Sequence, residues 1–195
     1  MNDCWTIKKE MMMNKMKLSV RECCVISVFV AMIVAVSQLA IPIGQVPITL
    51  QTFIIPLSGA VLGAKKGALA AFVYVLLGAI GLPVFAGFRG GIHMIIGPTG
   101  GYILSFPFMA FIVGFAADKK NLIWLTLGLV AGALLNLSMG TLQFAFVTGN
   151  TVQAAFFMAF APFVLIEMMK MVPILMLAPV LRKLLETVGE QYKGA

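Results

Sequence analysis

Long apolar stretches separated by short charged segments dominate the pattern along this chain. Residues 23–64, 67–88 and 121–166 contain no Lys, Arg, Asp or Glu. A transmembrane helix needs roughly 20 apolar residues, and fewer where it is partly buried in protein. Divided at charged, Gly and Pro positions, the stretches predict six transmembrane helices, at residues 23–41, 49–64, 67–82, 102–117, 122–147 and 154–181.

The second to fourth predicted helices are short and rich in Gly and Pro. Broken or irregular helices occur in membranes where they are buried in protein or line a cavity. The pattern therefore predicts an all-α, polytopic membrane protein with a cavity beside its short helices. We expect residues 1–22 to form a cytoplasmic N-terminal segment, residues 23–184 the six-helix transmembrane domain, and residues 185–195 a cytoplasmic tail.

Composition strengthens this prediction, because 61% of the 195 residues are hydrophobic and only 11% are charged. About a quarter of the residues of a soluble domain are normally charged. The missing water-facing surface indicates that the lipid bilayer is the solvent, so we predict an integral membrane protein.

The basic residues predict the orientation. Of the 14 Lys and Arg residues, all but Arg89 and Lys170 fall in the segments before the first helix, after the second, after the fourth and after the sixth. Since Lys and Arg near helix ends favour the cytoplasmic side, both termini of this multi-pass protein should be cytoplasmic in the cell membrane. The net charge of +7 is spread over these segments, so no nucleic-acid partner is expected.

Residues typical of metal sites, nucleotide sites and enzymes are missing from the pattern. Cys4, Cys23 and Cys24 lack metal-site spacing, and His93 is the single histidine, so we predict no bound metal. The stretch 63–67 lacks the spacing and the hydroxyl of a phosphate-binding loop. We therefore predict no catalytic residues and no nucleotide site; any ATP must be hydrolysed by another subunit.

Glu167 and Lys170 are the only charged residues within the predicted helices. An ionisable side chain at membrane depth costs several kcal/mol unless it contacts protein, water or a partner. Three positions apart on a helix, the two lie on one face and can pair with each other or meet a polar ligand together. A purely structural ion pair is the alternative, and it is the weaker one because such pairs contribute little stability.

Further polar and aromatic residues are candidates for lining a pocket with this pair. Gln51, Thr52, Tyr74, Asn136 and Gln143 lie within neighbouring predicted helices, although interhelical hydrogen bonding explains any one of them at least as well.

The outer loop, residues 81–102, is rich in Gly and aromatic residues and carries Arg89, which is a further candidate for contacting a ligand. Its Phe85, Phe88 and Tyr102 could cover a ring, unless it is only a turn at the membrane interface.

Small residues recur every four positions on the first predicted helix, at Ser27, Ala31 and Ala35. Such a stripe lets a second helix approach closely, either within the bundle or from a partner subunit.

Several motifs follow one another in a characteristic order. They are Gln45-Val46-Pro47-Ile48-Thr49-Leu50-Gln51-Thr52-Phe53, Gly81-Leu82-Pro83-Val84-Phe85, Gly97-Pro98-Thr99-Gly100-Gly101-Tyr102 and the late pair Glu167 and Lys170. In this order they resemble the BioY family, the biotin-binding S components of energy-coupling factor (ECF) transporters. The resemblance covers essentially the whole chain after residue 20.

The resemblance implies a six-helix S component with an outward-facing site for biotin and no cofactor of its own. It also implies partners, namely a transmembrane coupling protein of the EcfT type and two cytoplasmic ATPases that use ATP. Ala31 and Ala35 match the small-residue contact with the coupling protein. The substrate-binding subunit is thought to reorient in the membrane to deliver its ligand.

Carried over residue by residue, the resemblance makes Lys170 a biotin contact. Glu167 stands where the family has Asp, so its carboxylate is displaced by one methylene. Tyr74, Phe85 and Tyr102 suit the bicyclic ring or the alkyl chain. The family varies at Ala86 and Gly87, where the backbone should contribute more than the side chains. Which end of biotin meets the acid and the lysine stays open.

Two other functions are compatible with a six-helix membrane protein. A stand-alone secondary biotin transporter would use Glu167 as its ion-coupling acid. A non-transporting structural membrane protein would use the loop and the ion pair for packing alone. Neither explains the ordered motifs.

Overall fold

The computed structural model describes residues 19–41 and 46–191. Cys4, Gln45, Lys193 and the basic residues before Ser19 lie outside these described ranges. In chain order the elements are α2 (Val20–Ser37), β1 (Ala40–Ile41), β2 (Ile48–Thr49), α3 (Gln51–Leu62), α4 (Ala64–Ala79), α5 (Ile92–Ile96), α6 (Gly100–Ala117), α7 (Leu122–Thr148), α8 (Val152–Ala155), the π-helical turn η1 (Phe156–Phe160) and α9 (Ala161–Gln191).

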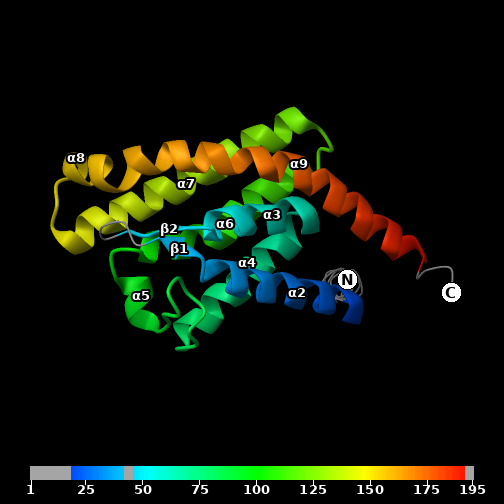
Figure 1. Cartoon of the computed structure of the whole chain (residues 1–195), viewed down its shortest axis with the longest axis horizontal. Helices are drawn as coiled ribbons and strands as arrows, with labels where there is room; N and C mark the ends of the chain where they lie inside the picture. Colours follow the sequence, from blue (N-terminus) through cyan, green and yellow to red (C-terminus); the bar gives the residue numbers. More distant parts are fainter. Residues whose placement is uncertain (1–18, 42–45, 192–195) are drawn as a thin grey trace, which may run out of the picture.

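The long helices run back and forth along the long axis of the molecule (Figure 1). At one end lie β1, β2, α5 and α8, which we call the loop end. The other end holds the start of α2 and the end of α9. There, Lys66 pairs with Glu22, and Arg182 pairs with Asp118, each at 2.7 Å. We call it the basic end, since Lys65, Lys119 and Lys120 belong to the same chain reversals.

Helix α2 begins with a capping box, in which the Ser19 hydroxyl accepts from Glu22 N and the Glu22 carboxylate accepts from Ser19 N. It ends at Ser37, so the prediction of a helix to residue 41 is wrong. Ala40 and Ile41 instead pair antiparallel with Thr49 and Ile48. In this strand pair the backbone N–H and C=O groups of residues 40–41 find partners across the strands, where a further helical turn would have paired them within the helix.

Helices α3 and α4 are separated by Gly63 alone, whose φ of +83° turns the chain between them. Lys65 and Lys66 therefore lie in the first turn of α4, not in the loop expected from the sequence. A Cβ at Gly59 would lie 2.2 Å from the carbonyl oxygen of Ala110, so glycine is required where α3 crosses α6.

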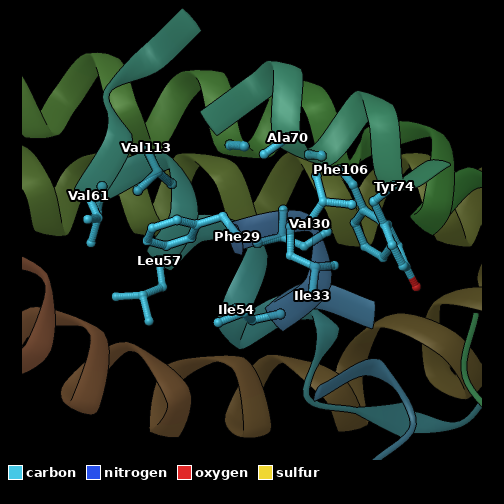
Figure 2. Close-up of a cluster of buried hydrophobic side chains, with 14 of the residues drawn as sticks. Phe29, Val30, Ile33, Ile54, Leu57, Val61, Ala70, Tyr74, Phe106 and Val113 are labelled. Atoms are coloured by element: carbon cyan, nitrogen blue, oxygen red, sulfur yellow. The ribbon is translucent and has the colours of Figure 1, made fainter. Parts of the chain in front are cut away.

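Figure 2 shows the main core, where α2, α3, α4 and α6 meet. Phe29 and Ile33 of α2 pack there with Ile54 and Leu57 of α3, and with Phe106 of α6. Helix α7 packs most extensively against α6, while α9 contacts α3 and α7. This arrangement brings the start of α3 against the middle of α9, although more than 100 residues separate them in sequence.

By length and hydropathy, four of the described helical stretches could cross a bilayer, namely α2, α6, α7 and the continuous run Val152–Thr187. The predicted second helix is α3, which is apolar but has only 12 residues. The predicted sixth helix does not end at residue 181 but continues to Gln191. Phe72, Phe108 and Phe146 are among the large apolar side chains exposed on the outside, as expected for a lipid-facing surface.

Candidate functional site

A cavity of about 320 Å³ opens at the loop end, within the size range of small-molecule sites. It lies between the β1–β2 segment, the start of α3, the loop after α4, and helices α5, α6, α7 and α9. Its lining comprises Ala40, Val46, Pro47, Thr49, Gln51, Thr52, Phe85, Ala86, Gly87, Arg89, Met94, Thr99, Tyr102, Ile103, Phe106, Asn136, Leu137, Phe163, Glu167 and Lys170.

An ion pair forms one wall of this cavity. The Lys170 ammonium lies 2.7 Å from Glu167 Oε1, and the two side chains are only 11% and 7% exposed. The same ammonium donates to the carbonyl oxygen of Thr49 at 2.9 Å and to Thr52 Oγ1 at 2.6 Å. All three ammonium protons therefore have an acceptor, as a buried lysine requires.

Thr52 bridges the two charges. Its hydroxyl accepts from Lys170 and donates to Glu167 Oε1 at 2.6 Å. Within the described part of the chain, Glu167 Oε2 has no hydrogen-bond partner, and Glu167 lines the cavity. The pair is thus neutral overall, yet it offers a carboxylate oxygen to a hydrogen-bond donor in the cavity.

A second layer of hydrogen bonds supports this wall. Gln51 accepts from the Thr49 hydroxyl and donates to the Tyr74 hydroxyl. Tyr74 in turn donates to the carbonyl oxygen of Val84, which also accepts from Ser37 at the end of α2 and from Gln38 just after it. Tyr74 is fully buried behind the cavity, so it positions the wall and does not line the space.

The loop after α4 covers the cavity with a tight turn. Phe85 and Arg89 exchange backbone hydrogen bonds, while Gly87 and Phe88 have φ angles of +72° and +57°. The Gln38 side chain accepts from Phe88 N at 2.8 Å. Phe85 is buried with its ring edge against Tyr74, whereas Phe88 is 73% exposed and lies outside the cavity lining.

Tyr102 and Asn136 close the opposite wall. Asn136 donates to the Tyr102 carbonyl oxygen at 3.0 Å and to Ser105 Oγ at 2.6 Å. The Tyr102 hydroxyl donates to the carbonyl oxygen of Ala159 in η1, at 2.6 Å. Gly140 makes room for this ring, because a Cβ there would lie about 2.2 Å from it. Tyr102 thus lines the cavity and ties α6 to the start of the last helix.

Gln143 also has a structural position. Its amide donates to the carbonyl oxygens of Ile95 and Gly97, at 2.7 and 3.0 Å, and so holds the end of α5. It does not line the cavity. Among the described residues, no cluster of three or more His, Cys, Asp or Glu side chains could hold a metal ion.

The sequence pattern that defines the BioY family matches residues 11–187 of this chain. The chain belongs to the BioY family.

Relatives within the BioY family cover most of the chain. The chain is 42% identical to a biotin transporter BioY of Thermotoga maritima, over 80% of its own length and 93% of the length of that transporter. It is also 42% identical to biotin transporter BioY2 of Lactococcus lactis, over 72% and 78%. A probable biotin transporter BioY of Pyrococcus horikoshii is 45% identical over 58% of this chain and 70% of its own length.

A solved structure shares the fold. The crystal structure of the S-component for biotin from an ECF-type ABC transporter superposes with a TM-score of 0.78 at 28% identity, covering 84% of this chain and 92% of that one. The prediction of an all-helical membrane protein with the S-component fold is therefore confirmed, as is membership of the BioY family.

The structure brings most of the predicted site residues of this BioY chain to one cavity. Lys170, Glu167, Gln51, Phe85, Ala86, Gly87, Arg89, Tyr102 and Asn136 all line it, whereas Tyr74 and Gln143 support it from behind. The sequence analysis missed Thr49. This residue contributes its backbone carbonyl oxygen, which every residue type has, so no sequence pattern could reveal it. Phe163 was also missed, although its position four residues before Glu167 places it on the same helix face.

Replacing the bridging threonine tests the satisfied ion pair. Thr52→Val removes one acceptor of Lys170 and one donor to Glu167, and should lower the free energy of unfolding by about 1–3 kcal/mol. Thermal melting in detergent detects this loss of stability as a lower melting temperature. Thr126→Val is the matched control, because the Thr126 hydroxyl bonds only to Leu122 O of its own helix. Equal melting temperatures for the two variants would contradict a structural role of the Thr52 hydroxyl.

Proposed function

We propose that this chain is a biotin-binding S component, which captures biotin in the loop-end cavity for an ECF-type importer. The observation that carries the proposal is the buried Glu167–Lys170 pair, which faces a small-molecule cavity built from the ordered family motifs. A purely structural pair would not need a 320 Å³ cavity beside it. Biotin presents ureido N–H donors and a carbonyl acceptor, which complement a carboxylate and an ammonium.

The charge balance favours one orientation of biotin. Glu167 and Lys170 already form a neutral pair, so a ligand carboxylate beside them would leave one net negative charge buried. Arg89 is exposed, lines the cavity and has no ion-pair partner among the described residues. We therefore place the ureido ring at Glu167 and Lys170, and the valerate carboxylate at Arg89 near the opening.

The orientation in the membrane follows the basic residues. In the described structure Lys66, Lys119, Lys120 and Arg182 lie at the end opposite the cavity. The basic end is therefore proposed to be cytoplasmic, with both termini on that side and the cavity facing outward.

A coupling surface is proposed on α2. Ser27, Ala31 and Ala35 are exposed, while Ile26, Phe29, Val30 and Ile33 on the other side of the helix are buried in the core. The small residues are therefore not used for packing within the bundle. A transmembrane coupling protein of the EcfT type can approach them closely, and it would link this subunit to two cytoplasmic ATPases.

A titration tests ligand identity. The detergent-purified chain should bind biotin saturably, but not thiamine or riboflavin. Lys170→Ala should weaken biotin binding by about 1.5 to 3 kcal/mol, because the ammonium, which exchanges one of its protein acceptors for the ureido oxygen on binding, is lost. Lys65→Ala, an exposed lysine at the basic end, should bind like the wild type. A folded protein that binds no biotin would refute the assignment, and wild-type affinity in Lys170→Ala would remove Lys170 from the site.

Biotin methyl ester tests the orientation, because it lacks the carboxylate charge. Arg89→Gln should weaken biotin binding by about 1–2 kcal/mol while leaving the affinity for the ester unchanged. Isothermal titration of both ligands against both proteins separates the two effects. If Lys170→Ala, rather than Arg89→Gln, abolishes the difference between acid and ester, the carboxylate lies at the inner end and the proposed orientation is wrong.

A bulky residue tests the coupling surface. Ala35→Trp should reduce co-purification with the coupling protein at least tenfold, because the indole separates the two helices, while biotin affinity stays unchanged. Ala131→Trp is the matched control, since Ala131 is also exposed but lies on α7. Equal recovery of the coupling protein with both variants would exclude α2 as the contact.

A further inference from the structure

A second cavity, of about 550 Å³, lies at the basic end between α3, α6, α7 and α9. This basic-end cavity lies at the opposite end of the fold from the loop-end cavity, and the two cavities share no lining residue. Three basic residues line it, Lys120, Arg182 and Lys183, together with Glu186.

The charges around this cavity are unbalanced. Asp118 bonds to Arg182 Nη2 at 2.7 Å, and Glu186 lies 3.6 Å from Arg182 Nε, so both acids contact the same guanidinium. Lys120 and Lys183 have no ion-pair partner among the described residues. The three basic and two acidic residues leave one positive charge in excess.

Arg182 is also incompletely satisfied. Its Nη1 is buried and has no hydrogen-bond partner within residues 19–41 and 46–191. A buried guanidinium nitrogen without an acceptor is costly, and native structures rarely leave one so. Nη1 is enclosed by protein and does not face the cavity, so Lys120 and Lys183 are the groups that can meet an anion there.

The rest of the wall is apolar, with Leu122, Leu125, Ala178 and Pro179 beside the basic residues. It continues onto a lipid-facing surface, because Leu122, Val180 and Leu184 are 60%, 64% and 62% exposed. Trp124, which is 52% exposed on the first turn of α7, is typical of the boundary between lipid and water. A small soluble anion would leave this apolar part of the wall without a contact, whereas an acyl chain would cover it.

We propose that the basic-end cavity binds the phosphate headgroup of an anionic phospholipid. The phosphate meets Lys120 and Lys183, which have no ion-pair partner among the described residues, while the glycerol and first acyl carbons lie along Leu122, Leu125 and Ala178. Basic pockets between helices at a membrane surface are suited to such headgroups. The bound lipid joins the α6–α7 reversal to α9. This proposal does not rest on the ligand of the loop-end cavity.

Native mass spectrometry of the full-length protein tests the proposal, with phosphatidylglycerol and phosphatidylcholine offered at equal concentrations. We expect phosphatidylglycerol adducts to dominate. In the double variant Lys120→Gln/Lys183→Gln the preference should fall by roughly fivefold per lysine. Thermal melting verifies that each variant is folded.

The matched control is Lys65→Gln/Lys119→Gln, which removes the same charge from two exposed lysines at the same end but outside the cavity. It should keep the wild-type preference. An equal loss in both double variants would indicate general surface attraction and overturn the site. Displacement of the lipid by soluble glycerol phosphate would assign the cavity to a free phosphate. Loss of coupling-protein recovery with unchanged lipid preference would make it a protein contact instead.

Discussion

The buried pair of Glu167 and Lys170 is the interaction on which the rest of the site depends. Charges at membrane depth are costly unless they pair with one another or with polar groups of the protein. Lys170 achieves this with Glu167, the Thr49 carbonyl oxygen and the Thr52 hydroxyl. Meeting that requirement brings the first turn of α3 against the middle of α9. The strand pair β1–β2 immediately before α3 then holds Thr49 in the extended conformation that exposes its carbonyl oxygen.

A second requirement follows from the first. The wall that carries the pair is backed by Gln51 and Tyr74, and Tyr74 reaches the carbonyl oxygen of Val84 in the loop that covers the cavity. The same oxygen accepts from Ser37 and Gln38 at the end of α2. The charged pair, the covering loop and α2 are therefore linked by one chain of hydrogen bonds. These hydrogen bonds connect the charged wall of the cavity to the end of the helix that carries Ser27, Ala31 and Ala35.

The two ends of the bundle have different electrostatics. At the loop end the buried charges of Glu167 and Lys170 cancel, which suits the mostly neutral ring that is proposed to bind there. At the basic end Lys120, Arg182 and Lys183 exceed the nearby acids, which suits an anionic surface. Between the two ends, α3 crosses α6 closely at Gly59, where a Cβ would lie 2.2 Å from the carbonyl oxygen of Ala110.

The sequence by itself determined the membrane environment, the six longer helices, the family and about half of the cavity lining, but it did not reveal the short helix α5. Those properties follow from apolar length, charge position and ordered motifs, which are local. The tertiary structure alone decided that Tyr74 and Gln143 support the cavity from behind, and that Thr49 contributes a backbone oxygen. It also decided where α2 ends and how Gly63 joins α3 directly to α4. These outcomes depend on hydrogen bonds between residues far apart in the chain, such as Lys170 to Thr49, and no local pattern encodes which partner a buried polar group will find.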